Sequence, residues 1–140
     1  MDTKNKNKII LDLCGGTAAW SAPYKGAGYN VKLVTLPDYD ITKTEYDGDS
    51  VIFVGEHKRS VVERNEVYGV LAAPPCTMFS FTRSKGKTPR DIEAGMKIVR
   101  ACLEVIWFCM EVQQDTRHKK LPLKFWALEN PNGMLKFLLG

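Results

Sequence analysis

Four short apolar runs, separated by longer stretches of mixed composition, constrain the fold of this chain more than any other feature. They cover residues 8–13, 31–36, 67–73 and 123–128. Each run has the length of a strand, and a continuous apolar run, rather than an alternating one, is typical of a strand buried on both faces. Because helical patterns lie between the runs, the sequence favours an α/β domain with a mostly parallel sheet.

The clearest helical pattern follows Thr88. Thr88 can cap this helix, Pro89 suits its first turn, and Asp91 is favoured there by the helix dipole. Cys102 and Cys109 lie in the same helix, and we interpret them as packing residues without a chemical role. The apolar residues recur every three or four positions and predict one core-facing stripe: Ile92, Met96, Val99, Leu103, Ile106 and Met110.

Two other stretches are less regular. After the first run we expect a short helix that is interrupted near Pro23 and ends by Gly28. Residues 38–66 leave two interpretations open. Residues 51–55 and 60–62 are either two strands of a hairpin around 56–59, or one strand followed by a loop.

Composition narrows the class of protein. The 140 residues are one domain's worth, and an apolar content of 44% is enough for a hydrophobic core. No apolar stretch approaches the roughly 20 residues that cross a membrane, and residues 1–8 are polar rather than signal-like. The four cysteines show no Cys-x-x-Cys spacing, so neither zinc nor a redox pair is indicated, and we expect a reduced, cytoplasmic protein. The net charge of +4 is compatible with nucleic-acid binding but does not by itself indicate it.

Reactive side chains follow three of the four runs. The first run ends in Asp-Leu-Cys-Gly-Gly (12–16), the third continues into Ala-Ala-Pro-Pro-Cys-Thr-Met-Phe-Ser (72–80), and the fourth ends in Leu-Glu-Asn-Pro (128–131). A thiol and a carboxyl group, each at the carboxyl end of a strand, suit covalent chemistry on a ring. The Gly turn is of the kind that lets a cofactor approach the backbone at this end of an open sheet.

These three segments, in this order, resemble motifs of the DNA cytosine-5 methyltransferase family. Its members carry a DLFxGxG-like cofactor loop, a PPCxxFS-like nucleophile motif and an EN[V/P] motif, and the resemblance extends from Ile9 to Gly133. Thymidylate synthase-type enzymes also carry a Pro-Pro-Cys, but they lack a Gly loop on an N-terminal strand. The resemblance implies a Rossmann-like, mostly parallel sheet that binds S-adenosylmethionine, with DNA as substrate and the target cytosine flipped out of the duplex.

The resemblance assigns catalysis to Cys76 and Glu129. In the family a thiolate adds to carbon 6 of cytosine and makes carbon 5 nucleophilic, and the prolines before Cys76 would hold it in a fixed, extended geometry. Glu129 would protonate or hydrogen-bond nitrogen 3 of the ring, and a dry pocket would raise the pKa of its carboxyl group for this task. The alternatives are a buried structural thiol and a surface or helix-capping glutamate.

The resemblance also implies a set of cofactor-binding residues. S-adenosylmethionine would contact Leu13, Cys14, Gly15, Gly16, Thr17, Asp38, Asp40 and Pro74. The choice between Asp38 and Asp40 for the ribose hydroxyls stays open, although Asp40-Ile41 resembles the family's Asp-Ile pair near the adenine. The chain departs from the pattern at Cys14, where Phe is usual, and at Ala18 and Ala19, where Gly is common.

A basic stretch after the nucleophile motif is the predicted contact to DNA. The substrate would be held by Pro75, Ser80, Arg83, Lys85, Lys87 and Asn130. In the family this segment is a loop that closes over the flipped base, and its lysines and arginines can reach phosphates. The alternative is a solvated loop, which is what most runs of charge are.

The chain as a whole is expected to be a single, incomplete catalytic domain, residues 1–140. The family continues with further strands, a Gln-x-Arg-like motif and a target-recognition domain, and none of these is found in the sequence. Two other functions therefore stay open. One is a catalytically silent module that binds cofactor or nucleic acid; the other is methylation of RNA cytosine, since RNA-directed relatives share the motifs.

Overall fold

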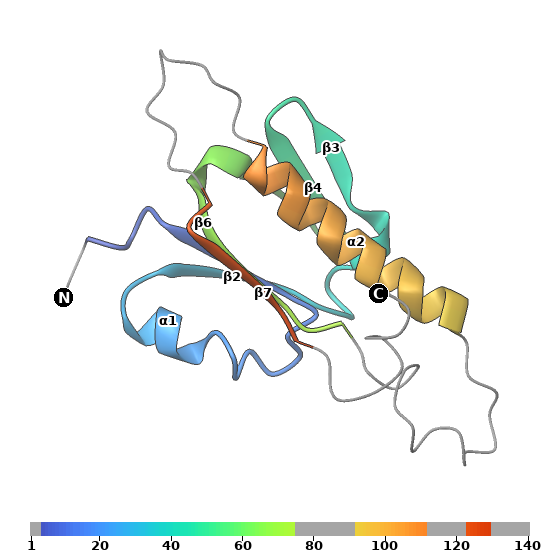
Figure 1. Ribbon diagram of the computed structural model, residues 1–140, viewed down its shortest axis with the longest axis horizontal. Coiled ribbons are helices and arrows are strands. Elements are labelled where there is room, and N and C mark those ends of the chain that lie inside the picture. The colour runs from blue at the N-terminus through green and yellow to red at the C-terminus, as the bar shows by residue number, and fades with distance from the viewer. Residues whose placement is uncertain (1–3, 75–91, 112–122, 130–140) are drawn as a thin grey trace.

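The computed structural model of the protein describes residues 4–74, 92–111 and 123–129, while residues 1–3, 75–91, 112–122 and 130–140 lie outside the description (Figure 1). In chain order the elements are β1 (Ile9–Leu13), α1 (Ala22–Gly26), β2 (Asn30–Val34), η1 (Ile41–Lys43), β3 (Glu45–Asp47), β4 (Ser50–Val54), β5 (Arg59–Glu63), η2 (Arg64–Glu66), β6 (Val67–Ala72), α2 (Ile92–Met110) and β7 (Phe125–Leu128).

Four strands form a parallel sheet in the order β2-β1-β6-β7. Leu13 of β1 pairs with Val34 of β2 and with Ala72 of β6, and Ala72 in turn pairs with Leu128 of β7. Every residue of β1 is buried, as expected for a central strand covered on both faces. The predicted parallel sheet is confirmed, with strand boundaries that differ from the predicted runs by one or two residues.

A second, antiparallel sheet contains the strands in the order β3-β4-β5. Of the two interpretations of this stretch the hairpin is correct, because Val51 pairs with Val62 and Val54 with Arg59. The sequence did not predict β3, because its three residues are all exposed and form no apolar pattern. Gly48, in the tight turn between β3 and β4, has a φ of 59°, a conformation that favours glycine.

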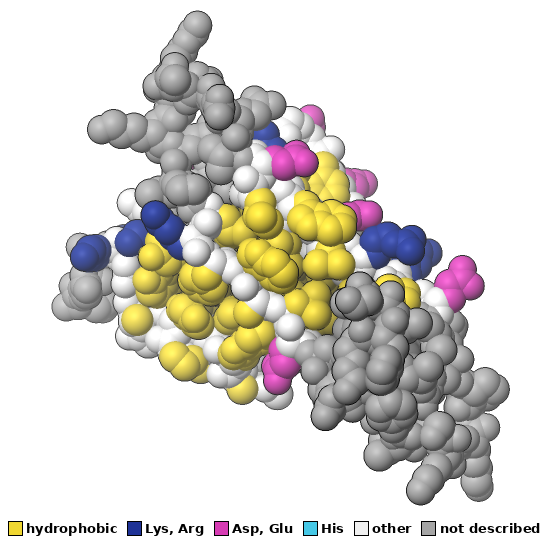
Figure 2. All heavy atoms as spheres, viewed as in Figure 1, with side chains coloured by type: hydrophobic (Ala, Val, Ile, Leu, Met, Phe, Trp, Pro, Cys, Tyr) yellow, Lys and Arg dark blue, Asp and Glu magenta, His cyan; other side chains and the backbone are white. Residues whose placement is uncertain are grey.

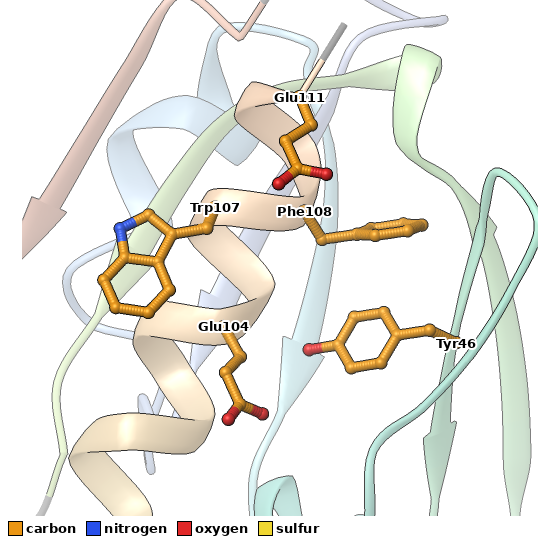
Figure 3. Close-up of a pocket in the computed structure, with 5 residues that line it drawn as sticks. All are labelled: Tyr46, Glu104, Trp107, Phe108 and Glu111. Atoms are coloured by element: carbon orange, nitrogen blue, oxygen red, sulfur yellow. The ribbon is translucent and has the colours of Figure 1, made fainter. Parts of the chain in front are cut away.

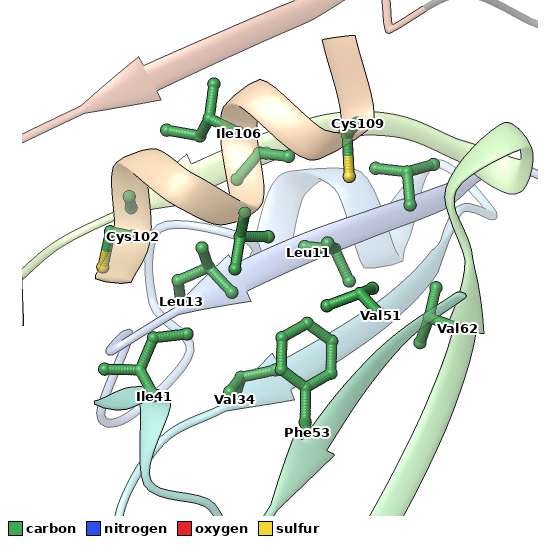
Figure 4. Close-up of a cluster of buried hydrophobic side chains, with 14 of the residues drawn as sticks. Leu11, Leu13, Val34, Ile41, Val51, Phe53, Val62, Cys102, Ile106 and Cys109 are labelled. Carbon is green, nitrogen blue, oxygen red and sulfur yellow. The ribbon is translucent and has the colours of Figure 1, made fainter. Parts of the chain in front are cut away.

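The hydrophobic core lies between the two sheets and α2. Figure 4 shows side chains from β1, β2, η1, β4, β5 and α2 converging on one cluster. Phe53 of β4 is the largest fully buried side chain in it, and Leu11 and Leu13 of β1 are also fully buried. The antiparallel sheet therefore belongs to the same core as the parallel one.

Helix α2 confirms much of the predicted stripe and corrects it at Met110. Val99 and Ile106 are buried as predicted, but the side chain of Met110 is 49% exposed. The buried row passes instead through Cys102 and Cys109, which pack in the core. Met110 is one residue beyond Cys109 and so lies about 100° farther round the helix. The prediction that both cysteines are packing residues is confirmed.

A cluster of aromatic rings lies beneath α1. The ring of Phe125 occupies the space above Gly69, where a Cβ would overlap it, and stacks on Tyr24 of α1 with centroids 5.5 Å apart. Tyr29 and Tyr68 extend the cluster, with centroids 5.4 Å apart. Figure 2 shows hydrophobic side chains gathered over β7 and the parts of α1 and α2 beside it. A five-residue helix covers only a small area of the sheet, and the packing of these rings covers more of it.

A buried arginine connects the antiparallel sheet to α2. The guanidinium of Arg64 forms an ion pair of 2.6 Å with Asp49 in the β3–β4 turn. The same group lies 4.7 Å from the ring centroid of Phe108 and donates a hydrogen bond of 3.5 Å to its carbonyl oxygen. Arg64 thereby holds the β3–β4 turn against the C-terminal part of α2.

Candidate functional site at the carboxyl edge of the parallel sheet

Three backbone hydrogen bonds continue the parallel sheet beyond its strands. The N–H of Cys14 donates to Val34 at 2.7 Å, that of Ala73 donates to Leu13 at 2.9 Å, and that of Glu129 donates to Ala72 at 2.8 Å. The segments after β1, β6 and β7 therefore leave the same edge of the sheet side by side. All three segments that the sequence analysis singled out begin here.

The strand order reverses direction within this sheet. From β1 the chain passes to β2 on one side, whereas β6 lies on the other side of β1. In open α/β sheets, ligands bind outside the carboxyl ends of the strands at the point where the strand order reverses. Here that point lies between β1 and β6.

The loop after β1 contains three residues in the left-handed backbone region: Cys14 (φ 61°), Gly16 (φ 58°) and Ala18 (φ 62°). For a residue with a side chain this conformation costs roughly 1–2 kcal/mol. Ala18 thus has a backbone geometry that favours glycine. Its N–H donates to the carbonyl of Gly15 at 3.0 Å, and the N–H of Gly16 donates to Thr35 Oγ1 at 3.3 Å, which ties the loop to the end of β2.

The two glycines of this loop are required for different reasons. At Gly15 a Cβ would overlap the carboxyl group of Asp12, so this glycine accommodates a neighbouring side chain rather than a ligand. At Gly16 a Cβ would have no heavy atom within 4 Å, so the backbone there faces open space. Gly16 is the residue of the pair that a ligand can approach.

Asp12 is a site residue that the sequence analysis missed. Its side chain is fully buried, and Ser21 Oγ donates a hydrogen bond of 2.5 Å to its Oδ2. Its Oδ1 has no hydrogen-bond partner in the described part of the chain. Burial raises the pKa of Asp12, and the bond from Ser21 lowers it by a smaller amount. The signal was available in the sequence, as an aspartate inside an otherwise apolar run.

A cavity of about 200 Å³ lies at the ends of β1 and β2. It is largely apolar, and the polar groups among its lining side chains are the hydroxyls of Thr35 and Tyr39 and the thiol of Cys14. The described residues that line it are Cys14, Val34, Thr35, Leu36, Tyr39, Ile41 and Ile98. A flat, weakly polar group such as a nucleobase suits such a lining.

The two candidate aspartates differ in their surroundings. Asp38 is exposed and forms an ion pair of 3.1 Å with Lys58 of the β4–β5 hairpin. Asp40 caps η1, its Oδ1 accepting hydrogen bonds from the N–H and the hydroxyl of Thr42 at 3.0 and 2.6 Å. Neither aspartate is among the described residues that line the cavity, but Asp40 lies between two that are, Tyr39 and Ile41. The charge of Asp40 also partly opposes the lowering of the pKa of the Cys14 thiol.

Cys14 contacts a second thiol. Its pKa is lowered chiefly by a hydrogen bond with Cys102 of α2, against smaller raising effects of burial and of the charges on Asp40 and Asp12. The same hydrogen bond raises the pKa of Cys102. Cys14 is therefore both a wall of the cavity and a partner of the helix behind it.

Some of the other predicted site residues lie in the described part of the chain, and the rest lie outside it. Leu13 is buried in the core, Thr17 is exposed, Pro74 is buried just before the description stops, and Glu129 is exposed at the end of β7. The described residues do not enclose the carboxylate of Glu129, so they do not supply the dry pocket that was expected for it. The remaining predicted residues lie outside the described part: Pro75, Cys76, Ser80, Arg83, Lys85, Lys87 and Asn130.

A second cavity, of about 270 Å³, lies away from this edge between α2 and β3 (Figure 3). Tyr46 and Phe108 pack against each other in its lining with ring centroids 4.8 Å apart, and Glu104 and Glu111 flank them along the helix. Burial, with a smaller effect of Glu104, raises the pKa of Tyr46 above its usual range. None of the three motifs contributes to this cavity.

Comparisons with known proteins do not extend these observations. No protein-family model, no curated protein and no solved structure matches the chain. In residues 4–74, 92–111 and 123–129, no helix is both long and apolar enough to cross a membrane. Over the same residues, no group of three or more His, Cys, Asp or Glu side chains is placed to hold a metal ion.

Proposed function

We propose that this chain is a DNA cytosine-5 methyltransferase by lineage, with a Rossmann-like sheet, S-adenosylmethionine as methyl donor and Cys76 as nucleophile. The observation that carries the proposal is the register of β1, β6 and β7. Through the bonds from Ala73 to Leu13 and from Glu129 to Ala72, the cofactor-loop, thiol and carboxylate motifs start from adjacent positions on one edge. The described residues that lead into the three motifs lie side by side at the edge where open α/β sheets bind ligands, which supports the proposal.

The residues of the β1 loop fit the cofactor assigned to them. S-adenosylmethionine would supply a methyl group on a positively charged sulfur. Gly16 would let the backbone approach the ligand, the cavity behind Cys14 and Thr35 would take the adenine, and Asp40 would serve the ribose hydroxyls. This fit rests on the open space above Gly16 and on the apolar cavity lining. Leu13 would contribute its backbone, because its side chain is part of the core.

The reaction divides between two side chains. The thiolate of Cys76 forms a bond to carbon 6 of cytosine while Glu129 provides a proton or hydrogen bond at nitrogen 3, where negative charge develops. S-adenosylmethionine, when bound, would supply the methyl group to carbon 5 and leave as S-adenosylhomocysteine. Loss of the carbon 5 proton to water restores the ring double bond and expels the thiolate, which regenerates Cys76, and any proton given to nitrogen 3 returns to Glu129. No metal is needed for any of these steps.

The test uses DNA duplexes that contain 5-fluorocytosine within random flanking bases, together with S-adenosylmethionine. With fluorine at carbon 5 there is no proton to remove, so the elimination is blocked and the thioether to Cys76 should persist through denaturing electrophoresis. Cys76→Ser should abolish the adduct, and Glu129→Gln should slow its formation by about 10²–10⁴-fold. Cys109→Ala is the matched control, because Cys109 is buried in the core and should not affect the chemistry.

The outcomes separate the alternative functions. An adduct that survives Cys76→Ser would show that the nucleophile is wrong. An adduct on fluorocytosine-containing RNA alone would redirect the substrate to RNA. A wild-type chain that binds S-adenosylmethionine in calorimetry but forms no adduct on either nucleic acid would be a silent binding module.

A further inference from the structure

The cavity between α2 and β3 is built mainly from one face of the helix. Its lining residues on α2 follow the three- and four-residue spacing that places side chains on a single face: Glu104, Trp107, Phe108 and Glu111. Tyr46 of β3 packs beside Phe108 with the two ring planes tilted by 55°. Figure 3 shows Trp107 on one side of this face, Phe108 and Tyr46 on the other, and a glutamate towards either end. Three aromatic rings and two carboxylates therefore surround one hollow.

The two carboxylates are exposed and lack an opposite charge beside them. In the described part of the chain neither Glu104 nor Glu111 forms an ion pair, and no basic side chain is among the described residues that line the cavity. Seven residues separate the two glutamates, which is about 10.5 Å along the helix axis. That spacing leaves room between them for a cation larger than a bare metal ion.

Two of the rings are exposed, and the third already contacts a cation elsewhere. The side chain of Trp107 is 53% exposed and that of Tyr46 is 38% exposed. The faces of such rings attract cations, that of tryptophan most strongly. The guanidinium of Arg64 lies 4.7 Å from the ring centroid of Phe108 but does not line the cavity. Its charge is compensated by the 2.6 Å ion pair with Asp49, so it opposes a second cation only weakly.

We propose that this cavity binds a methylated ammonium group, carried by a small molecule or by a lysine side chain. Such a group combines a positive charge with an apolar surface of methyl groups, which matches carboxylates set beside aromatic rings. A trimethylammonium group has no N–H donors, so it leaves water at a lower cost than a bare, strongly hydrated ammonium. The cavity volume of about 270 Å³ is just below the roughly 300–1,000 Å³ of sites for drug-sized ligands, so it suits one small head group. This binding is independent of the proposed methyl transfer, because none of the three motifs lines the cavity.

The first experiment titrates the full chain with choline and with its neutral isostere, 3,3-dimethylbutan-1-ol. The NMR shifts of the backbone amides of residues 104–111 report binding. The isostere has the same shape without the charge, so it should bind about 2- to 30-fold more weakly than choline. Trp107→Ala should weaken choline binding by a factor in the same range. Trp126→Ala is the matched control, because Trp126 is 46% exposed but outside the cavity, and it should leave the affinity unchanged.

The second experiment tests the carboxylates. Glu104→Gln and Glu111→Gln should each lower the affinity for choline by about 1.5- to 5-fold, the range of exposed charge pairs. Each should also make the affinity less dependent on salt. Glu93→Gln, in the first turn of the same helix but outside the cavity, is the control and should change neither quantity.

A glycine-flanked peptide with one trimethyllysine identifies the source of the group. Tighter binding of the peptide than of choline would support a protein partner, and the reverse would support a free small molecule.

Three results would overturn the proposal: no shift at residues 104–111 with either probe, an isostere that binds as tightly as choline, or equal affinities of Trp107→Ala and Trp126→Ala. The second of these would mean that the cavity is merely apolar. None of them bears on adduct formation at Cys76, and a failed 5-fluorocytosine assay would leave this site standing.

Discussion

The two sheets of the molecule contribute different things to the candidate site. The central strand β1 of the parallel sheet is buried, and the strands of this sheet lead into the three motifs that contain reactive groups. The antiparallel sheet has an exposed edge strand, β3, and carries none of the three motifs. Yet Phe53, the largest fully buried side chain, comes from the antiparallel sheet. A sheet without reactive groups can therefore be as necessary to a site as the sheet that presents them.

The antiparallel sheet also supports one wall of the cavity. The N–H of Asp40 donates to the carbonyl of Val54, the last residue of β4, at 2.9 Å. Gly55 packs directly against the carbonyl oxygen of Asp38, where a Cβ would overlap it. Because Tyr39 and Ile41 line the cavity, the position of this wall depends on the end of β4. Mutations at the end of β4 can therefore test whether the cavity wall depends on the antiparallel sheet.

The largest expected effect is that of Phe53→Ala, which tests whether the two sheets form one folding unit. Removal of a fully buried phenylalanine side chain should lower the free energy of unfolding by about 3–5 kcal/mol, measured by urea denaturation. Val61→Ala in the same sheet, where the side chain is 59% exposed, should change it by less than about 0.5 kcal/mol. An unfolding curve with two separate transitions would contradict a shared core.

A smaller effect is expected for Gly55→Ala, which tests the support of the cavity wall. The added methyl group must push the backbone at Asp38 away, and we expect a loss of about 1–3 kcal/mol in the free energy of unfolding. Affinity for S-adenosylmethionine should fall with it. Gly26→Ala in α1 is the control, since a Cβ there meets nothing within 4 Å, and it should not destabilise the protein. Full stability of Gly55→Ala would show that the wall does not depend on β4.

The smallest effect is expected in the parallel sheet's own loop, for Ala18→Gly. Glycine takes a φ near 62° without steric cost but has more freedom when unfolded, so the net gain in the free energy of unfolding should be at most about 1 kcal/mol. Ala19→Gly is the matched control: Ala19 does not have a positive φ, so the same change should destabilise by about 0.5–1 kcal/mol. Equal effects of the two substitutions would mean that the left-handed geometry is not strained.

The fold could be predicted where burial is continuous along the chain. The runs that became β1 and β6 are buried along most of their length, so their pattern is visible in the sequence. β3 could not be predicted, because three exposed residues carry no pattern. The stripe of α2 was predicted with an error at Met110, because the buried face of the helix includes Cys102 and Cys109, which lie about 80–100° round the helix from Met110.

The site was predictable in its location but not in its contacts. Three motifs at strand ends must meet when the strands are parallel, and Cys14 and Glu129 do lie on one edge. The sequence could not show that Gly15 accommodates Asp12, or that Asp38 is paired with Lys58. These contacts depend on loop paths and on the antiparallel sheet, neither of which has a periodic signature. The placement of residues at neighbouring strand ends could be predicted, whereas the contacts of individual loop residues could not.

The left-handed backbone at Ala18 has an evolutionary consequence. Alanine and glycine codons are neighbours in the genetic code, so the loop can exchange these residues by a single-base change while the rest of the fold maintains its shape. A chain of this kind can then replace a glycine by alanine, at a cost of roughly 1–2 kcal/mol, and keep the left-handed geometry that glycine favours. A pattern that requires the letter G at such positions would pass over chains whose main chain follows the same path.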